Sequence, residues 1–346
     1  MKKILIIEFN DFHEEVLLSQ VNYLKNNKDI KIYLYINEKL KSKLNFEKFN
    51  INICYINSKN RFTKIFSIFK ILKVIKKEKI DHIVFNTFES IYVLLIKSFL
   101  KNQKKFFIVH NVDKFKCKGK KNSQFLVLNE TLKKYTIKNY NKCNFDYFYP
   151  LIIVNELNNL NNKKKTEIKI IIPGLVELNR RDYLGFLKLI NNVDLDNIKF
   201  VFLGNILKND GPLVYKKLKE CDLLKKVKVY KNFVPYEEYF REIANSDLIM
   251  PLIHPGVKNF EKYHYAKITA AFSMAFSFKK PLLLYKSLAD LEEFKNISIS
   301  YDINNLVKIL RELDKNIINN LENKIKNTKK FSWEYQKDRY KRIIFE

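Results

Sequence analysis

Short apolar runs alternate with longer helix-periodic stretches along most of this chain. Strand-like runs such as KILIIEF, IKIYLYI and IDHIVFN are separated by stretches with a helical repeat, for example HEEVLLSQVNYLKNN. Strands that are apolar throughout are typical of parallel sheets covered on both faces. Their regular alternation with helices predicts βαβ units and a doubly wound α/β fold.

The pattern occurs twice. After YFYPLIIV the chain becomes polar and loses its apolar period, which predicts a linker at 154–166. A second set of strands follows, from IKIIIPG to SISYD. We therefore predict a Rossmann-like domain over 1–153, a second Rossmann-like domain over 167–325, and a C-terminal helix at 326–346 that packs back on the first domain. Two such domains would face a central cleft at the carboxyl ends of their strands, where open α/β sheets bind ligands.

The chain is strongly basic. It has 65 Lys and Arg residues against 37 Asp and Glu, a formal net charge of +28. This charge attracts polyanions, either nucleic acid or an anionic membrane leaflet; a solvated basic surface explains it as well. No nucleic-acid-binding motif is recognisable, so nucleic acid is not an expected partner.

The N-terminal segment and the spacing of the cysteines both favour a cytoplasmic protein. The apolar run of MKKILIIEFND is too short for a signal peptide. Lys97 interrupts IYVLLIKSFL, which we expect to form a buried helix and not a membrane span. The four cysteines are far apart and show no metal-ligand spacing.

Two basic segments suit a peripheral contact with anionic lipid. TKIFSIFKILKVIKKEK can form an amphipathic helix, and DKFKCKGKKNSQF gathers lysines beside aromatic residues. The alternative for the first segment is a core-facing helix with a solvated lysine edge.

The stretch IKIIIPGLVELNRRDY carries the first candidate ligand site. Gly174 ends a predicted strand and lets the backbone approach a ligand, while Arg180 and Arg181 stand where the next helix opens. Arginine forks there can hold a diphosphate. The alternative is that Asn179 caps the helix and the arginines are surface charge.

Other candidate contacts follow later strands. Asn205 ends IKFVFLGN, and Phe233, Val234 and Pro235 form a turn that suits a flat base or is a simple strand-to-helix connection. Lys267 and Thr269 precede the small residues of AKITAAFSMAF, where an anion would reconcile a lysine with a helix N-terminus. A lysine that points to solvent is the alternative.

The stretches PGLVELNRRDY, FLGN, VYKNFVP, SDLIMPLI and YHYAKITAAFSMAFSFKKPLLL resemble the GT-B glycosyltransferases, which use nucleotide-sugar donors. The resemblance covers nearly the whole chain. It implies a donor diphosphate near Gly174, Arg180 or Arg181, Lys267 and Thr269, with the base near Phe233, Val234 and Pro235. Asn205, Glu261 and Tyr265 complete the expected donor set, and no metal or other cofactor is expected.

The resemblance also implies acceptor contacts in the first βα loop. Asp11, His13 and Glu14 are the candidates for the catalytic base there, and His110 is an acceptor-side candidate. The alternative is that these residues only begin a helix. The E-x7-E signature of the large retaining families is missing, since Ala266 and Met274 stand at those positions.

The expected activity is transfer of a sugar from a nucleotide-diphosphate sugar to a glycan or lipid-linked acceptor of the cell surface. A nucleotide-sugar epimerase on the same scaffold is one alternative. A non-catalytic protein of this fold, or one that binds polyanions, is another.

Overall fold

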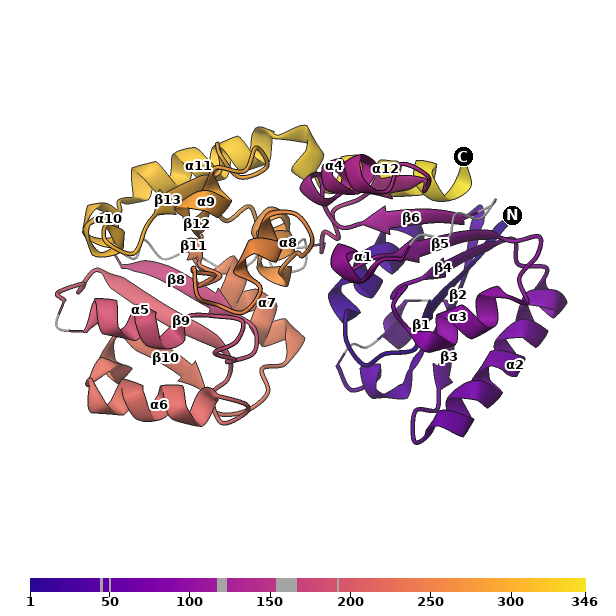
Figure 1. Ribbon diagram of the computed structural model, residues 1–346, viewed down its shortest axis with the longest axis horizontal. Coiled ribbons are helices and arrows are strands. Elements are labelled where there is room, and N and C mark those ends of the chain that lie inside the picture. Colours follow the sequence, from indigo (N-terminus) through magenta and orange to yellow (C-terminus); the bar gives the residue numbers. More distant parts are fainter. Residues whose placement is uncertain (44–45, 50, 117–122, 154–166, 192) are drawn as a thin grey trace. The chain divides into compact units, whose positions relative to one another are not determined.

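The computed structural model of the protein describes residues 1–43, 46–49, 51–116, 123–153, 167–191 and 193–346 (Figure 1). The predicted linker at 154–166 and residues 117–122 of the second basic segment lie outside the described residues. The chain divides into two compact units. Unit 1 comprises Met1–Ile153, Ala266–Ile268 and Trp333–Glu346, and unit 2 comprises Val154–Tyr265 and Thr269–Ser332.

Unit 1 is built on a parallel sheet in the order β3-β2-β1-β4-β5-β6-β7. Its central strand is apolar because both faces are covered, and the side chains from Ile4 to Ile7 are buried. The strands are β1 (Lys2–Glu8), β2 (Ile30–Asn37), β3 (Asn52–Ile56), β4 (His82–Phe85), β5 (Lys104–Ile108), β6 (Ser123–Val127) and β7 (Phe145–Tyr147).

Helices cover both faces of this sheet. The last helix, α12, packs on α1, where the Tyr340 hydroxyl donates to Oε1 of Gln20 at 2.9 Å. The helices of unit 1 are α1 (Glu14–Leu24), α2 (Arg61–Glu78), α3 (Ile91–Lys97), α4 (Glu130–Asn139) and α12 (Trp333–Phe345), with the 3-10 turns η1 (Glu38–Leu40), η2 (Phe46–Lys48) and η3 (Val112–Lys114).

Unit 2 has a second parallel sheet, in the order β10-β9-β8-β11-β12-β13. Its strands are β8 (Ile168–Pro173), β9 (Ile198–Asn205), β10 (Val227–Tyr230), β11 (Leu248–Ile249), β12 (Leu282–Tyr285) and β13 (Ser298–Tyr301). Its helices are α5 (Tyr183–Ile190), α6 (Gly211–Glu220), α7 (Tyr236–Ala244), α8 (Ala270–Phe278), α9 (Lys286–Ala289), α10 (Leu306–Glu312) and α11 (Lys315–Asn327), with the 3-10 turns η5 (Leu223–Lys225), η6 (Phe260–His264) and η7 (Lys329–Phe331).

Both sheets have the same topological switch point. In each unit the first strand lies third in the sheet, and the strand order reverses between it and the fourth strand of that unit. These pairs are β1 with β4 and β8 with β11. Open α/β sheets bind their ligands outside the carboxyl ends of the strands at such a point. The predicted α/β class with two Rossmann-like units is confirmed.

One helix differs from its prediction. The segment from Ile91 forms α3, but Ile91, Leu94 and Leu95 are exposed, so the expectation of a buried helix is wrong. Only Val93 and Ile96 of α3 are buried in the core. None of the described helices is both long enough and apolar enough to cross a bilayer.

Candidate functional site

Two glycines let the ends of two neighbouring strands of unit 2 come together. Gly174 follows β8 with a φ of 99°, a value that residues with a side chain rarely adopt. At Gly204, near the end of β9, a Cβ atom would stand only 2.2 Å from the carbonyl oxygen of Gly174. Gly204 is therefore needed for the ends of these two strands to pack backbone against backbone.

The Arg181 side chain lies against Gly174. Its Nη1 donates to the carbonyl of Leu175 at 3.0 Å, and a Cβ atom on Gly174 would lie 2.7 Å from Nη2. Its Nε is buried and has no hydrogen-bond partner among the described residues. Arg180 is exposed and pairs with Glu177 at 3.4 Å. Of the two arginines, Arg181 is the one held at the strand end, where its fork can bind an anion.

A hydrogen-bonded chain fixes the backbone next to Arg181. Asp182 caps α5 by accepting from the Gly185 N–H at 2.9 Å, and its second oxygen lies 2.8 Å from Nδ1 of His254. Nε2 of the fully buried His254 lies 2.6 Å from the Tyr301 hydroxyl. The hydrogen bond from His254 holds the pKa of Asp182 below its ordinary value, so the cap is ionised. The hydrogen bonds that link Asp182, His254 and Tyr301 therefore position the start of α5.

The donor-side candidate Asn205 and the candidates for contact with the base lie at two further strand ends. Oδ1 of Asn205 accepts from the Leu207 N–H at 2.8 Å, which closes the turn after β9. After β10, Phe233 is exposed and Val234 is buried, and Pro235 caps α7. The exposed ring of Phe233 is the flat apolar surface of this turn that a base could stack on.

The remaining donor-side candidates of unit 2 belong to η6 and α8. Glu261 is exposed in η6, 3.9 Å from Nδ1 of His264, and Tyr265 ends the same turn. Thr269 caps α8, and its hydroxyl accepts from the Ala271 N–H at 3.4 Å.

At the switch point of unit 1, the buried carboxyl of Glu8 accepts three hydrogen bonds. The donors are the Asn10 N–H at 2.7 Å, Nδ2 of Asn86 at 2.7 Å and the Thr87 hydroxyl at 2.6 Å. Burial outweighs these bonds and raises the pKa of Glu8 from 4.5 to about 7. Glu8 ends β1, and Asn86 follows β4, so this network ties together the two strands that flank the switch point.

Two of the predicted histidines stack on each other beside this network. The rings of His13 and His110 lie 3.5 Å apart at an interplanar angle of 12°. Nε2 of His110 donates to the Asn86 carbonyl at 2.7 Å. Desolvation lowers the pKa of His110 to about 4, so this imidazole is neutral at neutral pH. A neutral ring with one nitrogen committed is a contact residue and a weak base.

The two predicted carboxylates of the first βα loop both lie next to lysines. Asp11 is 3.6 Å from Nζ of Lys39, and Glu14 is 3.3 Å from Nζ of Lys43. Lys43 also donates to the Asp11 carbonyl, which ties this loop to the segment that follows η1. His13 adopts a left-handed backbone with a φ of 64° and begins α1.

Lys267 belongs to unit 1, although the sequence groups it with Thr269. Its backbone pairs with Asn111 in an isolated bridge, and the Val112 N–H donates to the Ala266 carbonyl at 3.0 Å. Lys267 therefore lies opposite Asn111, the residue that follows His110. The structure thus brings His13, His110 and Lys267 to one end of unit 1, and Gly174, Arg181 and Asn205 to one edge of unit 2.

The structure can be compared with known proteins. No protein-family model and no curated protein matches the sequence. Solved structures do match: a glycosyltransferase from Rickettsia africae ESF-5 is 14% identical with a TM-score of 0.73, over 99% of both chains. Alr3699/HepE from Anabaena, solved with UDP and glucose, is 12% identical with a TM-score of 0.71, also over 99% of both chains. A putative UDP-N-acetylglucosamine 2-epimerase from Listeria monocytogenes is 11% identical with a TM-score of 0.61, over 98% of this chain and 95% of its own.

The chain has the GT-B fold. The fold predicted from the sequence resemblance is confirmed at this level. The positions of the missing E-x7-E signature are occupied differently in this GT-B chain: Ala266 and Met274 are both buried, so neither position presents a side chain to a ligand.

Several residues at the two switch points of this GT-B chain were not predicted from the sequence. In unit 1 these are Glu8, Asn86 and Thr87, and in unit 2 they are Asp182 and His254. The signal was present in part, since Asn86 and Thr87 follow the strand IDHIVF and His254 follows SDLIMPLI. Such residues meet only if their strands are neighbours in the sheet, and the strand order cannot be read from the sequence alone.

Among the described residues, no group of three or more His, Cys, Asp or Glu side chains could hold a metal ion. Asp194 and Asp196, the only DLD pair of the chain, form a local turn in which Oδ1 of Asp194 accepts from the Asp196 N–H at 3.2 Å.

Proposed function

We propose that this protein is a glycosyltransferase that moves a sugar from a nucleotide-diphosphate sugar to a glycan or lipid-linked acceptor in cell-surface polysaccharide assembly. The observation that carries the proposal is the side chain of Arg181, folded over Gly174 at the carboxyl edge of β8. A guanidinium that lies on a glycine at a strand end, with a buried Nε that has no hydrogen-bond partner among the described residues, suits the diphosphate of a donor. The GT-B fold supports the same proposal, because the similar structures include glycosyltransferases.

In the proposed reaction the leaving group is a nucleoside diphosphate, and negative charge grows on it as the glycosidic bond breaks. Arg181 would stabilise that charge, and the Asp182–His254–Tyr301 chain would hold its backbone in place. Phe233, Val234 and Pro235 would contact the base, with Asn205, Glu261, Tyr265 and Thr269 as further donor contacts. Charge stabilisation by side chains makes a metal ion unnecessary in this scheme.

On the acceptor side, Asp11, His13 and Glu14 are the proposed bases for the acceptor hydroxyl proton. His110 is proposed as a contact residue, because its low pKa makes it a poor base at neutral pH. Lys267, which lies beside His110 through its pairing with Asn111, would contribute a positive charge to the diphosphate.

An epimerase that acts on a nucleotide sugar is the second candidate, favoured by the similarity to the putative epimerase of Listeria monocytogenes. The two candidates differ in what they consume. A transferase releases nucleotide only when an acceptor is present, whereas an epimerase converts the donor alone.

We further propose a cytoplasmic location with a peripheral contact to anionic membrane. The charge of +28 supports this contact, and a lipid-linked acceptor would require it.

The direct test of the donor site is a thermal-shift screen against UDP, GDP, CMP and dTDP. A nucleotide that binds only the folded protein raises its melting temperature with concentration. We expect one nucleotide to do so, with the shift lost in Arg181→Ala and Lys267→Ala and kept in Arg180→Ala, the matched control. A folded protein that responds to none of the four would contradict the proposal.

A further inference from the structure

Asn86 lies directly after β4 and is completely buried. Its main-chain N–H donates to the Ile7 carbonyl at 2.9 Å, which continues the pairing of β4 with β1. Its side-chain Nδ2 donates to Oε2 of Glu8 at 2.7 Å and to the His13 carbonyl at 3.3 Å. Its main-chain carbonyl lies 2.7 Å from Nε2 of His110. One buried residue therefore contacts both members of the stacked His13–His110 pair.

The hydrogen bond to Asn86 decides which ring nitrogen of His110 carries the proton. A main-chain carbonyl can only accept, so Nε2 of His110 is the protonated nitrogen. Because the lowered pKa of His110 keeps its ring neutral at neutral pH, Nδ1 then carries a free lone pair and can only accept. His110 is only partly buried, and no group in the described part of the chain donates a hydrogen bond to this Nδ1. Nδ1 is therefore available to a donor group of a substrate.

The direction of the Asn86 amide is set from α12. The Tyr340 hydroxyl donates to Oε1 of Gln20 at 2.9 Å, so Nε2 of Gln20 faces Asn86 and donates to its Oδ1. With the Asn86 amide turned the other way, two NH2 groups would face each other and the amide oxygen would face the Glu8 carboxyl. Gln20 and Tyr340 are as fully buried as Asn86, so these bonds are shielded from water. The donor side of the Asn86 amide is therefore fixed toward Glu8 and His13.

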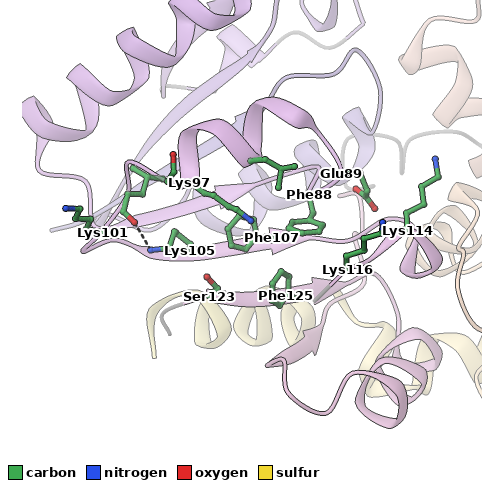
Figure 2. Close-up of a pocket in the computed structure, with 13 residues that line it drawn as sticks. Phe88, Glu89, Lys97, Lys101, Lys105, Phe107, Lys114, Lys116, Ser123 and Phe125 are labelled. Atoms are coloured by element: carbon green, nitrogen blue, oxygen red, sulfur yellow. Dashed lines mark hydrogen bonds between the residues drawn. The ribbon is translucent and has the colours of Figure 1, made fainter. Parts of the chain in front are cut away.

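The main chain of His110 is held by a second group, the carboxyl group of Glu89. Its Oε1 accepts from the N–H groups of His110 and Asn111, at 3.1 and 3.0 Å. Glu89 lines a pocket of about 720 Å³ in unit 1, at the end that Lys114 also lines (Figure 2). Asn86 and Glu89 belong to the same turn between β4 and α3. This turn therefore holds His110 by its ring and by its main chain.

His13 needs the same support, because its backbone has a φ of 64°, a costly value for a residue with a side chain. Its carbonyl accepts from Asn86 and, at 3.2 Å, from the Leu17 N–H. Its ring lies 3.5 Å from the ring of His110. Loss of the Asn86 amide would therefore loosen both rings of the pair.

We propose that Asn86 is a positioning residue, which holds His110 so that Nδ1 of that ring accepts a hydrogen bond from a sugar hydroxyl of the bound substrate. A hydroxyl is the matching group, because it can donate to Nδ1. The oxygens of a phosphate diester or a carboxylate cannot donate, so an anionic group does not fit at this nitrogen. The role toward a substrate rests on the proposed function, whereas the dependence of His110 on Asn86 does not.

The first test is nitrogen-15 NMR of the full-length protein with labelled histidine at pH 7. The chain has five histidines, and His110→Gln assigns the signals of His110. In the wild-type protein we expect the Nε2–H form of His110 alone, and in Asn86→Ala an exchange between both neutral forms. Thr87→Val is the matched control: Thr87 also donates to Glu8, at 2.6 Å, but within the described part of the chain it bonds to neither histidine.

Two NMR results would overturn the proposal. One is an unchanged His110 ring in folded Asn86→Ala, and the other is the same exchange in Thr87→Val. If Asn86→Ala does not fold, Gln20→Leu takes its place, because it removes the group that orients the Asn86 amide. An unchanged His110 ring in Gln20→Leu would then overturn the proposal.

The second test is the release of nucleoside diphosphate from a nucleotide sugar in the presence of a lipid extract. Asn86→Ala should slow this release about 100-fold, as expected for a misplaced group near the reacting atoms. It should keep the thermal shift with the nucleotide, which is expected to bind to unit 2. An unchanged rate, or a loss of the thermal shift as well, would contradict a positioning role. Absence of release by the wild-type protein would refute sugar transfer, and the NMR result would then decide alone.

Discussion

Gly174 and Gly256 both have a positive φ angle but differ in what surrounds them. Their φ angles are 99° and 93°. A Cβ atom on Gly174 would lie 2.7 Å from Nη2 of Arg181, whereas one on Gly256 would meet nothing within 4 Å. Alanine at either position should lower the free energy of unfolding by about 1–2 kcal/mol, measured in urea, because both φ values are costly for L residues.

The two variants, Gly174→Ala and Gly256→Ala, should differ in their affinity for the nucleotide. Only Gly174→Ala displaces the Arg181 guanidinium, so only this variant should lose nucleotide binding, with Gly256→Ala as the control for the backbone effect. Intact nucleotide affinity in a folded Gly174→Ala protein would remove Arg181 from the donor site.

Glu8 should give the protein a pH-dependent stability. The folded state keeps the proton of Glu8 up to about pH 7, while the unfolded state loses it near 4.5. Between these values the unfolded state binds fewer protons, so stability falls as pH rises, by about 3 kcal/mol in all for this group. In Glu8→Gln this decrease should be absent.

The measurement is urea unfolding of the wild-type protein and Glu8→Gln between pH 4 and pH 8. The difference between the two unfolding free energies should shift in favour of the variant as pH rises through this window. A difference that stays constant would mean that Glu8 titrates at its ordinary pKa in the folded protein.

At the scale of elements, α12 is held to unit 1 by a buried polar network. Its Tyr340 hydroxyl donates to Oε1 of Gln20, whose Nε2 bonds to Oδ1 of Asn86, which itself bonds to Glu8. Tyr340→Phe leaves the Gln20 oxygen buried without a donor, so the unfolding free energy should fall by about 1–3 kcal/mol.

Tyr33→Phe is the control for that substitution. The Tyr33 hydroxyl also donates a hydrogen bond, to Glu78 at 2.6 Å, but the Glu78 side chain is partly exposed and water can replace the donor. Its loss should therefore be the smaller of the two in urea unfolding. Equal losses would mean that the Tyr340 bond contributes nothing beyond a solvent-exposed one.

The elements that the sequence predicts best are those with long or fully apolar runs. The strands β8, β9, β11 and β12 of unit 2 follow from such runs, as do β1, β2, β4, β5 and β6 of unit 1. The strands β10 and β13 were predicted from the shorter, partly polar stretches VKVYKNF and SISYD. The strands β3 and β7 were not predicted, because NICYI is only half-buried and FDY is three residues long, too short to show a period. The exposure of Phe62, Phe66 and Phe69 on α2 was not predictable either, since an apolar run does not say which of two helix faces meets the core.

The candidate site was predictable where it depends on one loop. Gly174 and Arg181 are seven residues apart, and a strand that ends in Pro-Gly before a helix is enough to suggest them. The pairs Glu8–Asn86 and Asp182–His254 join residues more than seventy positions apart. They meet only because β1 adjoins β4 and β8 adjoins β11, which is a property of the whole sheet.

At the scale of the whole molecule, the two units repeat one topology with different chemistry. Each has a carboxyl group at its switch point, but the buried Glu8 is held by three neutral donors, whereas the half-buried Asp182 pairs with His254 and stands next to Arg181. In the proposed reaction, unit 2 would offer a fixed cation for a diphosphate, and unit 1 would offer histidines and carboxylates for a hydroxyl. This division is what a transfer between a nucleotide sugar and an acceptor needs.

The decisive measurement is phosphorus NMR of a panel of nucleotide sugars incubated with the protein, with and without a lipid extract as acceptor. Sugar transfer predicts that one donor yields its free nucleoside diphosphate only when the extract is present, and that Arg181→Ala abolishes this release. Conversion of a donor into a different nucleotide sugar without any extract would contradict transfer and identify an epimerase instead.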